Sequence, residues 1–142
     1  MLINQLTFGF FCTVFLFSLG LFYLYIKNQF DKKFFYAGLI FLFGAGFLLS
    51  AYQINTLPST ANIIFWNRFM YSCIFAFFFI FPLFVYNAIG KVYSKVFCWT
   101  TGILSTVLIV LTLFTNLFIK NELVNFAGIY RPEKSNISYL FV

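Results

Sequence analysis

The sequence predicts an all-α fold: a polytopic transmembrane bundle of four helical spans, followed by the start of a fifth. Hydrophobic residues make up 63% of the 142 residues and charged residues 8%, against about 45–50% and about 25% in soluble domains. The apolar residues also fall into runs of about 20, which is the length of helix that crosses a bilayer core of about 30 Å. These runs do not alternate polar and apolar residues as barrel strands do, so we expect helices.

The first two spans are predicted at residues 6–26 and 34–52. The first run contains no charged residue, and it is longer than the about 7–15 residues of a signal-peptide core, so we expect a retained helix. Residues 27–33 (KNQFDKK) end this span, because charged side chains are costly in the hydrocarbon core. Residues 53–62 (QINTLPSTAN) are predicted to form a polar loop after the second span.

The third and fourth spans are predicted at residues 63–89 and 96–119, with a tight connection at residues 90–95 (GKVYSK). Residues 120–135 are of mixed polarity and are expected to form a loop. Residues 137–142 (ISYLFV) are apolar again but too few to cross a bilayer. We expect them to be the start of a fifth span, and a short tail at the membrane surface is the alternative.

The positions of the cations predict the orientation. The loops after the first and third spans contain Lys27, Lys32, Lys33, Lys91 and Lys95, and no Lys or Arg precedes the first span. Because cytoplasmic loops are enriched in Lys and Arg, we expect a multi-pass protein of the cell inner (plasma) membrane with its N-terminus outside. The lipid bilayer is then its main partner. No nucleic acid is expected as a partner, because these cations do not form the basic stripe of a nucleic-acid binder.

The sequence contains no catalytic constellation. It has no His, and its three acidic residues all lie in predicted loops, whereas pumps and proton-coupled transporters place such groups at mid-membrane. Cys12, Cys73 and Cys98 lie within apolar runs, without CxxC spacing and without a His to complete a metal site. We therefore expect no enzyme activity, no cofactor and no metal in this segment, although the full-length protein could carry an output enzyme such as a kinase.

Small and polar residues recur in each span at spacings of three, four or seven, where Leu16 and Leu108 occupy the gaps of seven, and this places each set on one helical face. The sets are Gly9, Thr13 and Gly20; Gly46, Ser50 and Gln53; Arg68, Ser72 and Ala76; and Thr101, Ser105, Thr112 and Asn116. Small residues let membrane helices approach closely, and hydroxyls can bond between helices. The two interpretations are helix packing and a polar pocket in the bundle interior.

Arg68 is the one ionisable residue within or at the edge of a predicted span. A helix of about 20 residues crosses the bilayer core, and counting about 20 residues back from Lys91 reaches Tyr71. Arg68 precedes Tyr71 and is therefore expected at the outer interface. There it is either an anchor whose side chain reaches water or a contact for a ligand or partner. Because Trp66 and Asn116 are expected at a similar depth, we take Trp66, Arg68 and Asn116 as candidate ligand or signal residues.

Pro82 lies in the middle of the third predicted span. A proline inside a helix removes one backbone hydrogen bond and usually introduces a kink. The kink is either static and packed, or it is a hinge whose angle changes with a ligand. Pro82 is therefore the hinge candidate.

Four short motifs occur in order along the chain: residues 66–71 (WNRFMY), residues 81–84 (FPLF), residues 113–116 (LFTN), and Gly128 followed by Lys134 and Tyr139. They resemble, in turn, an aromatic–Arg/Lys–Tyr pattern, a proline and aromatic in a third helix, a Thr-Asn pair closing a fourth helix, and a glycine-led hairpin before a fifth. Together they resemble the N-terminal seven-transmembrane sensor domain of bacterial histidine kinases and related signalling proteins. That family often has a His after the Thr-Asn pair, and this chain has none.

The resemblance implies that residues 1–142 are a single transmembrane domain, the first four helices of a larger membrane receptor. The expected function is sensory input in bacterial signal transduction, passing a ligand or membrane signal to a cytoplasmic output module that this chain does not contain. A small molecule at the outer face and, for a kinase receptor, a second copy are the expected partners. The alternatives are a complete four-helix membrane partner or scaffold subunit, and a fragment of a transporter.

Overall fold

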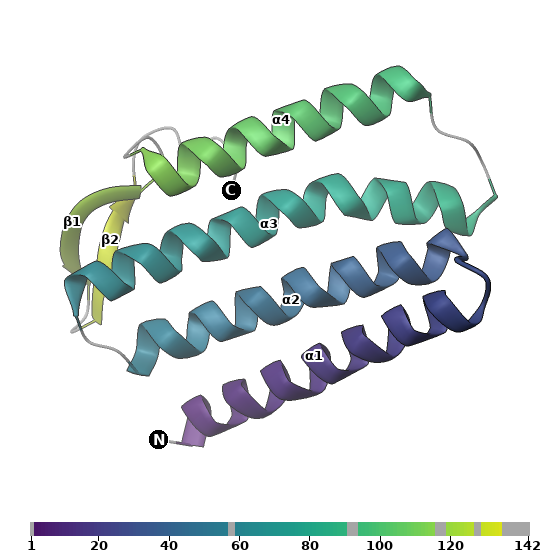
Figure 1. Ribbon diagram of the computed structural model, residues 1–142. Coiled ribbons are helices and arrows are strands. Elements are labelled where there is room, and N and C mark those ends of the chain that lie inside the picture. The colour runs from purple at the N-terminus through teal and green to yellow at the C-terminus, as the bar shows by residue number, and fades with distance from the viewer. Residues whose placement is uncertain (1, 57–58, 91–93, 116–118, 127–128, 135–142) are drawn as a thin grey trace.

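The structure is a computed structural model. It consists of four long helices and a short β hairpin (Figure 1). It describes residues 2–56, 59–90, 94–115, 119–126 and 129–134, and of the strand side chains it describes only Ile119. The elements are α1 (Leu2–Lys27), α2 (Lys32–Thr56), α3 (Thr60–Ala88), α4 (Lys95–Phe114), β1 (Ile119–Phe126) and β2 (Ile129–Lys134). All four helices are long and apolar enough to cross a membrane. The prediction of an all-α transmembrane fold with four spans is confirmed.

The ends of the helices differ from the predicted ones by up to about a turn. Ser59 and Ser94 cap α3 and α4, where their hydroxyls accept hydrogen bonds from the backbone N–H of Asn62 and Phe97 at 3.4 and 3.1 Å. The fourth helix ends at Phe114 and not at residue 119, because Thr115 has extended backbone dihedrals (φ −125°, ψ 164°). The predicted loop 120–135 contains most of the β hairpin.

The helices form an open layer in chain order (Figure 1). Extensive contacts join α1 to α2, α2 to α3 and α3 to α4, and both strands lie against α3. At one end of the layer α2 ends, α3 begins and α4 ends beside the hairpin, and we call this the hairpin end. The opposite end is here called the lysine end, because Lys27, Lys32, Lys33 and Lys95 lie there in the helix sequences.

Two hydroxyls bond directly between neighbouring helices. The Ser18 hydroxyl of α1 donates to the Gly38 carbonyl of α2 at 2.9 Å, and the Ser105 hydroxyl of α4 donates to the Phe75 carbonyl of α3 at 3.0 Å. Both serines are buried. Such bonds connect helices where hydrocarbon offers no polar alternative, so α1 is joined to α2, and α4 to α3, at defined positions.

Gly46 allows α2 and α3 to approach closely near the middle of α2. A Cβ at this position would lie 2.9 Å from the Cys73 Sγ of α3. The predicted stripes of the second, third and fourth spans do supply buried residues, namely Ser50, Ser72, Ala76, Ser105 and Thr112. Helix packing is therefore a role of these stripes, in agreement with the first of their two interpretations.

The stripe of the first span behaves differently. Gly9, Thr13 and Gly20 lie on an exposed face of α1, and nothing approaches within 4 Å of a Cβ built on either glycine. The small polar residue of α1 that packs against α2 is Ser18, which is fully buried. Since α1 is apolar on all sides, its sequence does not show which face meets α2.

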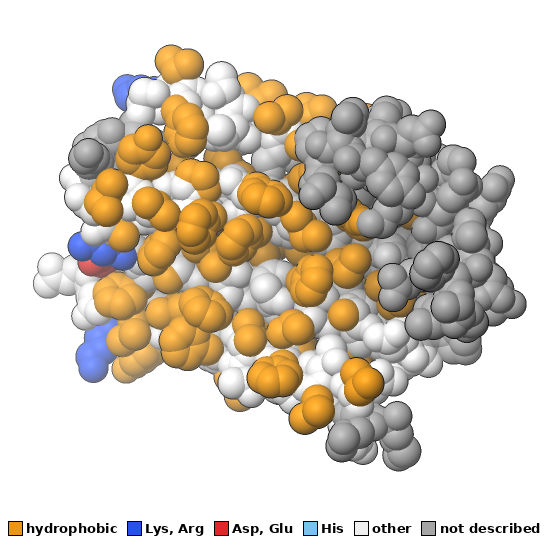
Figure 2. Space-filling model, turned by 180° about the vertical axis from the view of Figure 1, so that it is seen from behind, with side chains coloured by type: hydrophobic (Ala, Val, Ile, Leu, Met, Phe, Trp, Pro, Cys, Tyr) orange, Lys and Arg blue, Asp and Glu red, His pale blue; other side chains and the backbone are white. Residues whose placement is uncertain are grey.

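Apolar side chains cover the faces of the layer. Figure 2 shows them spread over the helices on one face, while the Lys and Arg side chains visible there lie at the lysine end. Twenty-seven large hydrophobic residues are exposed among those described, including Phe78, Phe81 and Val107. Exposed apolar surface on this scale is stable in hydrocarbon and not in water. The chain is a multi-pass membrane protein.

Replacing Gly46 by Leu is expected to destabilise the contact between α2 and α3. The new side chain meets Cys73, and overpacking of this kind costs about 1–3 kcal/mol. Gly20→Leu is the matched control, because the same change there meets open space. Thermal unfolding in detergent should show a lower Tm for Gly46→Leu only, and equal Tm values for the two variants would contradict the packing described.

Candidate functional site

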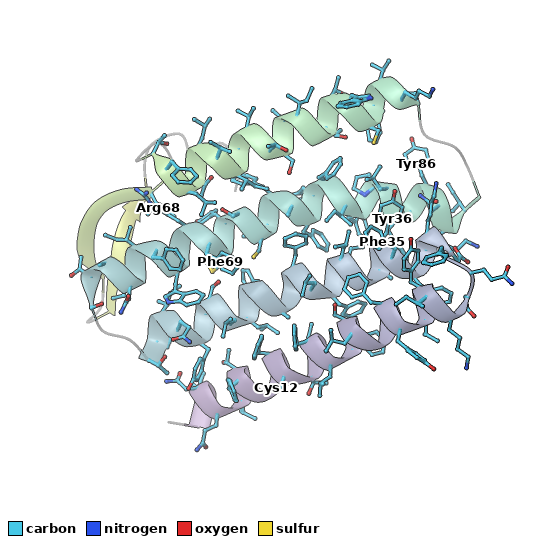
Figure 3. All side chains as sticks on the ribbon, viewed as in Figure 1. Cys12, Phe35, Tyr36, Arg68, Phe69 and Tyr86 are labelled. Carbon is cyan, nitrogen blue, oxygen red and sulfur yellow. The ribbon has the colours of Figure 1, made fainter. Side chains whose placement is uncertain are left out.

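Arg68 connects three elements at the hairpin end. From α3, its Nη1 donates to the Leu113 carbonyl of α4 at 2.9 Å and its Nη2 donates to the Ile119 carbonyl of β1 at 3.3 Å. Figure 3 shows the side chain of Arg68 extending from α3 toward the end of α4 and the hairpin. The guanidinium is partly buried, so these bonds form in surroundings of lower dielectric constant than water.

The bond to Leu113 caps the C-terminal end of α4. The last four carbonyls of a helix lack intrahelical partners, and Leu113 is one of these residues in α4. The Thr115 N–H satisfies the carbonyl of Leu111 at 3.1 Å, and Arg68 satisfies that of Leu113. A cation also complements the negative end of the helix dipole. Arg68 therefore stabilises the end of α4 both by hydrogen bonding and by its charge.

Ile119, the first residue of β1, is also held through its side chain. Its side chain is 2% exposed and packs with Phe75, and Tyr71 and Leu108 are among the residues around this pair. The residue is thus held by apolar contact through its side chain and by Arg68 through its carbonyl. The start of the hairpin is attached to the α3–α4 pair by both kinds of interaction.

The structure does not bring Trp66 and Arg68 together. Residues two positions apart in a helix point about 160° apart. The Trp66 ring contacts those of Phe65 and Phe69, with centroids 5.3 and 5.8 Å away. Phe69 lies toward α2, 3.5 Å from a Cβ built on Gly46, and Figure 3 shows it on a different side of α3 from Arg68. Asn116, the third candidate, lies outside the described residues.

A groove of about 510 Å³ opens beside Arg68, and its volume falls within the range typical of small-molecule sites. Its described lining residues are Thr60, Ala61, Ile64, Phe65, Arg68 and Leu113. Ala61, Ile64 and Arg68 follow a spacing of three and four residues, which places them on one side of the first two turns of α3. The groove therefore combines apolar walls, a helix N-terminus and a cation.

A second groove, of about 500 Å³, lies between Phe79 of α3 and the part of α4 nearer the lysine end. Its lining on α4 is Cys98, Trp99, Gly102, Ile103, Thr106 and Val107, none of which is charged. The groove is apolar apart from the Thr106 hydroxyl, which donates to the Gly102 carbonyl at 2.8 Å. The second groove can therefore accommodate an apolar group, but none of its described lining residues is charged and could bind a charged ligand.

Pro82 lies within α3, which continues through it from Thr60 to Ala88. A proline at this position donates no hydrogen bond to the Phe78 carbonyl one turn earlier. Ile80 and Leu83 on either side of it are buried. The structure thus places Pro82 in a packed part of α3, and its role as a hinge stays a hypothesis.

Within the part of the chain that the structure describes, no three His, Cys, Asp or Glu side chains gather where they could hold a metal ion. Cys12, Cys73 and Cys98 are free and lie in three different helices. The polar chemistry of the described site is therefore that of Arg68, backbone carbonyls and the start of α3.

Comparisons of this chain with protein-family models, with curated proteins and with solved structures find no match. The fold itself defines the class, a multi-pass helical membrane protein. The described site adds one feature to that class, an arginine that holds the end of a transmembrane helix and the start of a hairpin.

Arg68→Ala is expected to lower the stability of the protein in detergent by about 1.5–3 kcal/mol, which is the contribution of a hydrogen bond to a charged group. Arg68→Lys should recover part of this loss, because an ammonium keeps the charge but lacks the planar fork that reaches two carbonyls. The control is Lys27→Ala, which removes an exposed cation at the lysine end. Denaturant unfolding measures all three, and a wild-type midpoint for Arg68→Ala would disprove the capping role.

Proposed function

We propose that this chain is the membrane-embedded signal-input domain of a bacterial signal-transduction protein. In this proposal it passes a ligand or membrane signal to a cytoplasmic output module outside this chain. The observation that carries the proposal is the pair of Arg68 hydrogen bonds, to Leu113 at the end of α4 and to Ile119 at the start of β1. The side chain of Arg68 thereby contributes to the attachment of both α4 and β1 to α3.

Signalling needs two arrangements of the helices with different affinities for the signal. In the arrangement described, Arg68 holds the end of α4 against α3. An anion or polar group that competes for the guanidinium would favour a second arrangement in which this attachment is broken. The helix itself then carries the change to the lysine end, because α4 runs without interruption from Phe114 back to Lys95.

The positions of the lysines support the proposed orientation. Lys27, Lys32, Lys33 and Lys95 belong to one end of the layer, and α1 begins at the opposite end (Figure 1). By the positive-inside tendency the lysine end is cytoplasmic. The N-terminus, Arg68 and the hairpin then lie on the outer side of the inner membrane, where a signal would arrive.

The β hairpin supports the resemblance to the sensor domains of histidine kinases. The resemblance implied a glycine-led hairpin before a fifth helix, and β1 and β2 pair antiparallel on either side of residues 127–128. Gly128 itself lies outside the described residues. The register runs from Phe126 opposite Ile129 to Ile119 opposite Lys134, with an irregularity between Ile119 and Leu123.

One observation fits both the proposal and the alternative of a four-helix partner or scaffold subunit. The open layer exposes long apolar stretches of α1 and α4 at its two edges, including Leu16, Phe17 and Leu104. These edges suit contact with further transmembrane helices, whether of the same chain or of a partner. A receptor with three more helices and a subunit of a larger assembly both provide such helices.

The proposal predicts that the coding sequence continues beyond Val142. We expect three further apolar segments and then a soluble output module such as a kinase. Sequencing the DNA downstream of the codon for Val142 tests this directly. A stop codon at that point would remove the signal-input proposal and leave the partner or scaffold subunit as the stronger function.

The proposed orientation predicts which turns face the outside. Cysteines are introduced separately at Asn28 and Asn55, exposed positions at the lysine end and the hairpin end, in a chain lacking the three natural cysteines. A membrane-impermeant thiol reagent should label Asn55→Cys in intact cells and Asn28→Cys only after permeabilisation. The reverse pattern would place the N-terminus inside.

A further inference from the structure

We infer that the groove beside Arg68 binds the headgroup of an anionic phospholipid whose acyl chain lies along α4. The inference goes beyond the proposed function in naming a ligand, and it rests on that function only for the link between binding and signalling. Three features of the described residues carry it: the positive groups in the groove, its position at the end of two spans, and the apolar face of α4 that continues from it.

Two positive groups line the groove, about 10 Å apart along the axis of α3. Arg68 lines it, and so do Thr60 and Ala61 in the first turn of α3. Unpaired N–H groups and the helix dipole make a helix N-terminus favourable for anions, and the first turn of α3 contains no acidic residue that would offset this. A phosphate also suits Arg68 itself, because a guanidinium binds phosphate oxygens in a planar, bidentate manner. The groove is therefore complementary to a phosphodiester whose charge is not offset by a cation in the same headgroup.

The remaining walls suit the apolar part of a lipid. Ile64, Phe65 and Leu113 complete the lining, and Phe65 is 54% exposed. The groove lies where α3 begins and α4 ends, so it is at the level at which headgroups meet hydrocarbon. A water-soluble anion would gain little from these walls, whereas the upper part of an acyl chain would bury them.

The two grooves open on the same face of α4. Leu113 lines the groove beside Arg68, and Thr106 and Gly102 line the groove beside Phe79. Spacings of seven and four residues place these three positions on one helical face. The rise from Leu113 to Ile103 is about 15 Å, which is half of a bilayer core of about 30 Å and so the depth of one leaflet. A chain descending from Arg68 along this face reaches the second groove.

Binding would act on the contacts that Arg68 makes within the chain. A phosphate forms charge-assisted hydrogen bonds that are stronger than those to a neutral carbonyl. The headgroup therefore competes with the carbonyls of Leu113 and Ile119 for the guanidinium. A change in the anionic lipid content of the membrane would in this way shift the attachment of α4, which gives the proposed sensor a membrane signal.

The test is lipid retention by the whole chain, measured by native mass spectrometry after extraction from nanodiscs containing equal amounts of phosphatidylglycerol and phosphatidylcholine. We expect selective retention of one phosphatidylglycerol. Arg68→Gln and Ala61→Phe should each lower this retention about tenfold, the first by removing the charge and the second by filling the groove. Ala61→Phe leaves Arg68 in place, so it remains informative if Arg68→Gln folds poorly. Lys27→Ala, at the lysine end, should retain the lipid as the wild type does.

Equal retention of the two lipids by the wild type, or wild-type retention by Ala61→Phe, would overturn the inference. Release of the bound lipid by millimolar inorganic phosphate would also overturn it, because the site would then select a free anion and not a phospholipid. The measurement involves no output module. Its failure is therefore distinguishable from failure of the signal-input function, which depends on the sequence beyond Val142.

Discussion

The arrangement at the hairpin end depends on the hydrogen bond between the charged side chain of Arg68 and a carbonyl at the end of α4. A guanidinium near hydrocarbon needs polar partners, and the last carbonyls of a transmembrane helix need donors. Arg68 of α3 meets both requirements at once, with Nη1 at 2.9 Å from the Leu113 carbonyl. The second bond, to Ile119, brings the hairpin into the same arrangement. If this charge found other partners, the end of α4 and the first residue of β1 would each lose a hydrogen bond to α3 and keep only their packing against it.

Away from this end, close packing and hydroxyls hold the layer together. Gly46 lets α2 approach α3, and Ser18 and Ser105 bond to neighbouring backbones. None of these contacts uses a charge, so they are insensitive to ions and headgroups. The contrast assigns different roles to the two kinds of contact. Packing along the spans maintains the layer, while Arg68 connects the end of α4 and the start of the hairpin to α3 through its charged group.

The sequence predicted the four spans because length and hydropathy alone decide which segments cross a bilayer. From the distance between Arg68 and Lys91 it also predicted that Arg68 lies toward the end of its span away from the lysines, and α3 begins only eight residues before it. It did not predict the partners of Arg68, because Leu113 and Ile119 are 45 and 51 residues away and backbone carbonyls leave no mark in a sequence. The choice of Trp66 and Arg68 as candidates for one site used their depth and ignored their direction around the helix. The packing face of α1 was missed since lipid and protein both select apolar residues, so Ser18 and Thr13 look equivalent in sequence.

The most direct test of the account is hydrogen–deuterium exchange of the wild type and Arg68→Ala in the same detergent, read on peptides that cover the end of α4 and β1. The account predicts faster exchange in both segments, because both lose an attachment to α3, and unchanged exchange in α1 and α2. Unchanged exchange at the end of α4 and in β1 would contradict it. A uniform increase over all four helices would also contradict it, because Arg68 would then support the fold as a whole and not the junction of α4 with the hairpin.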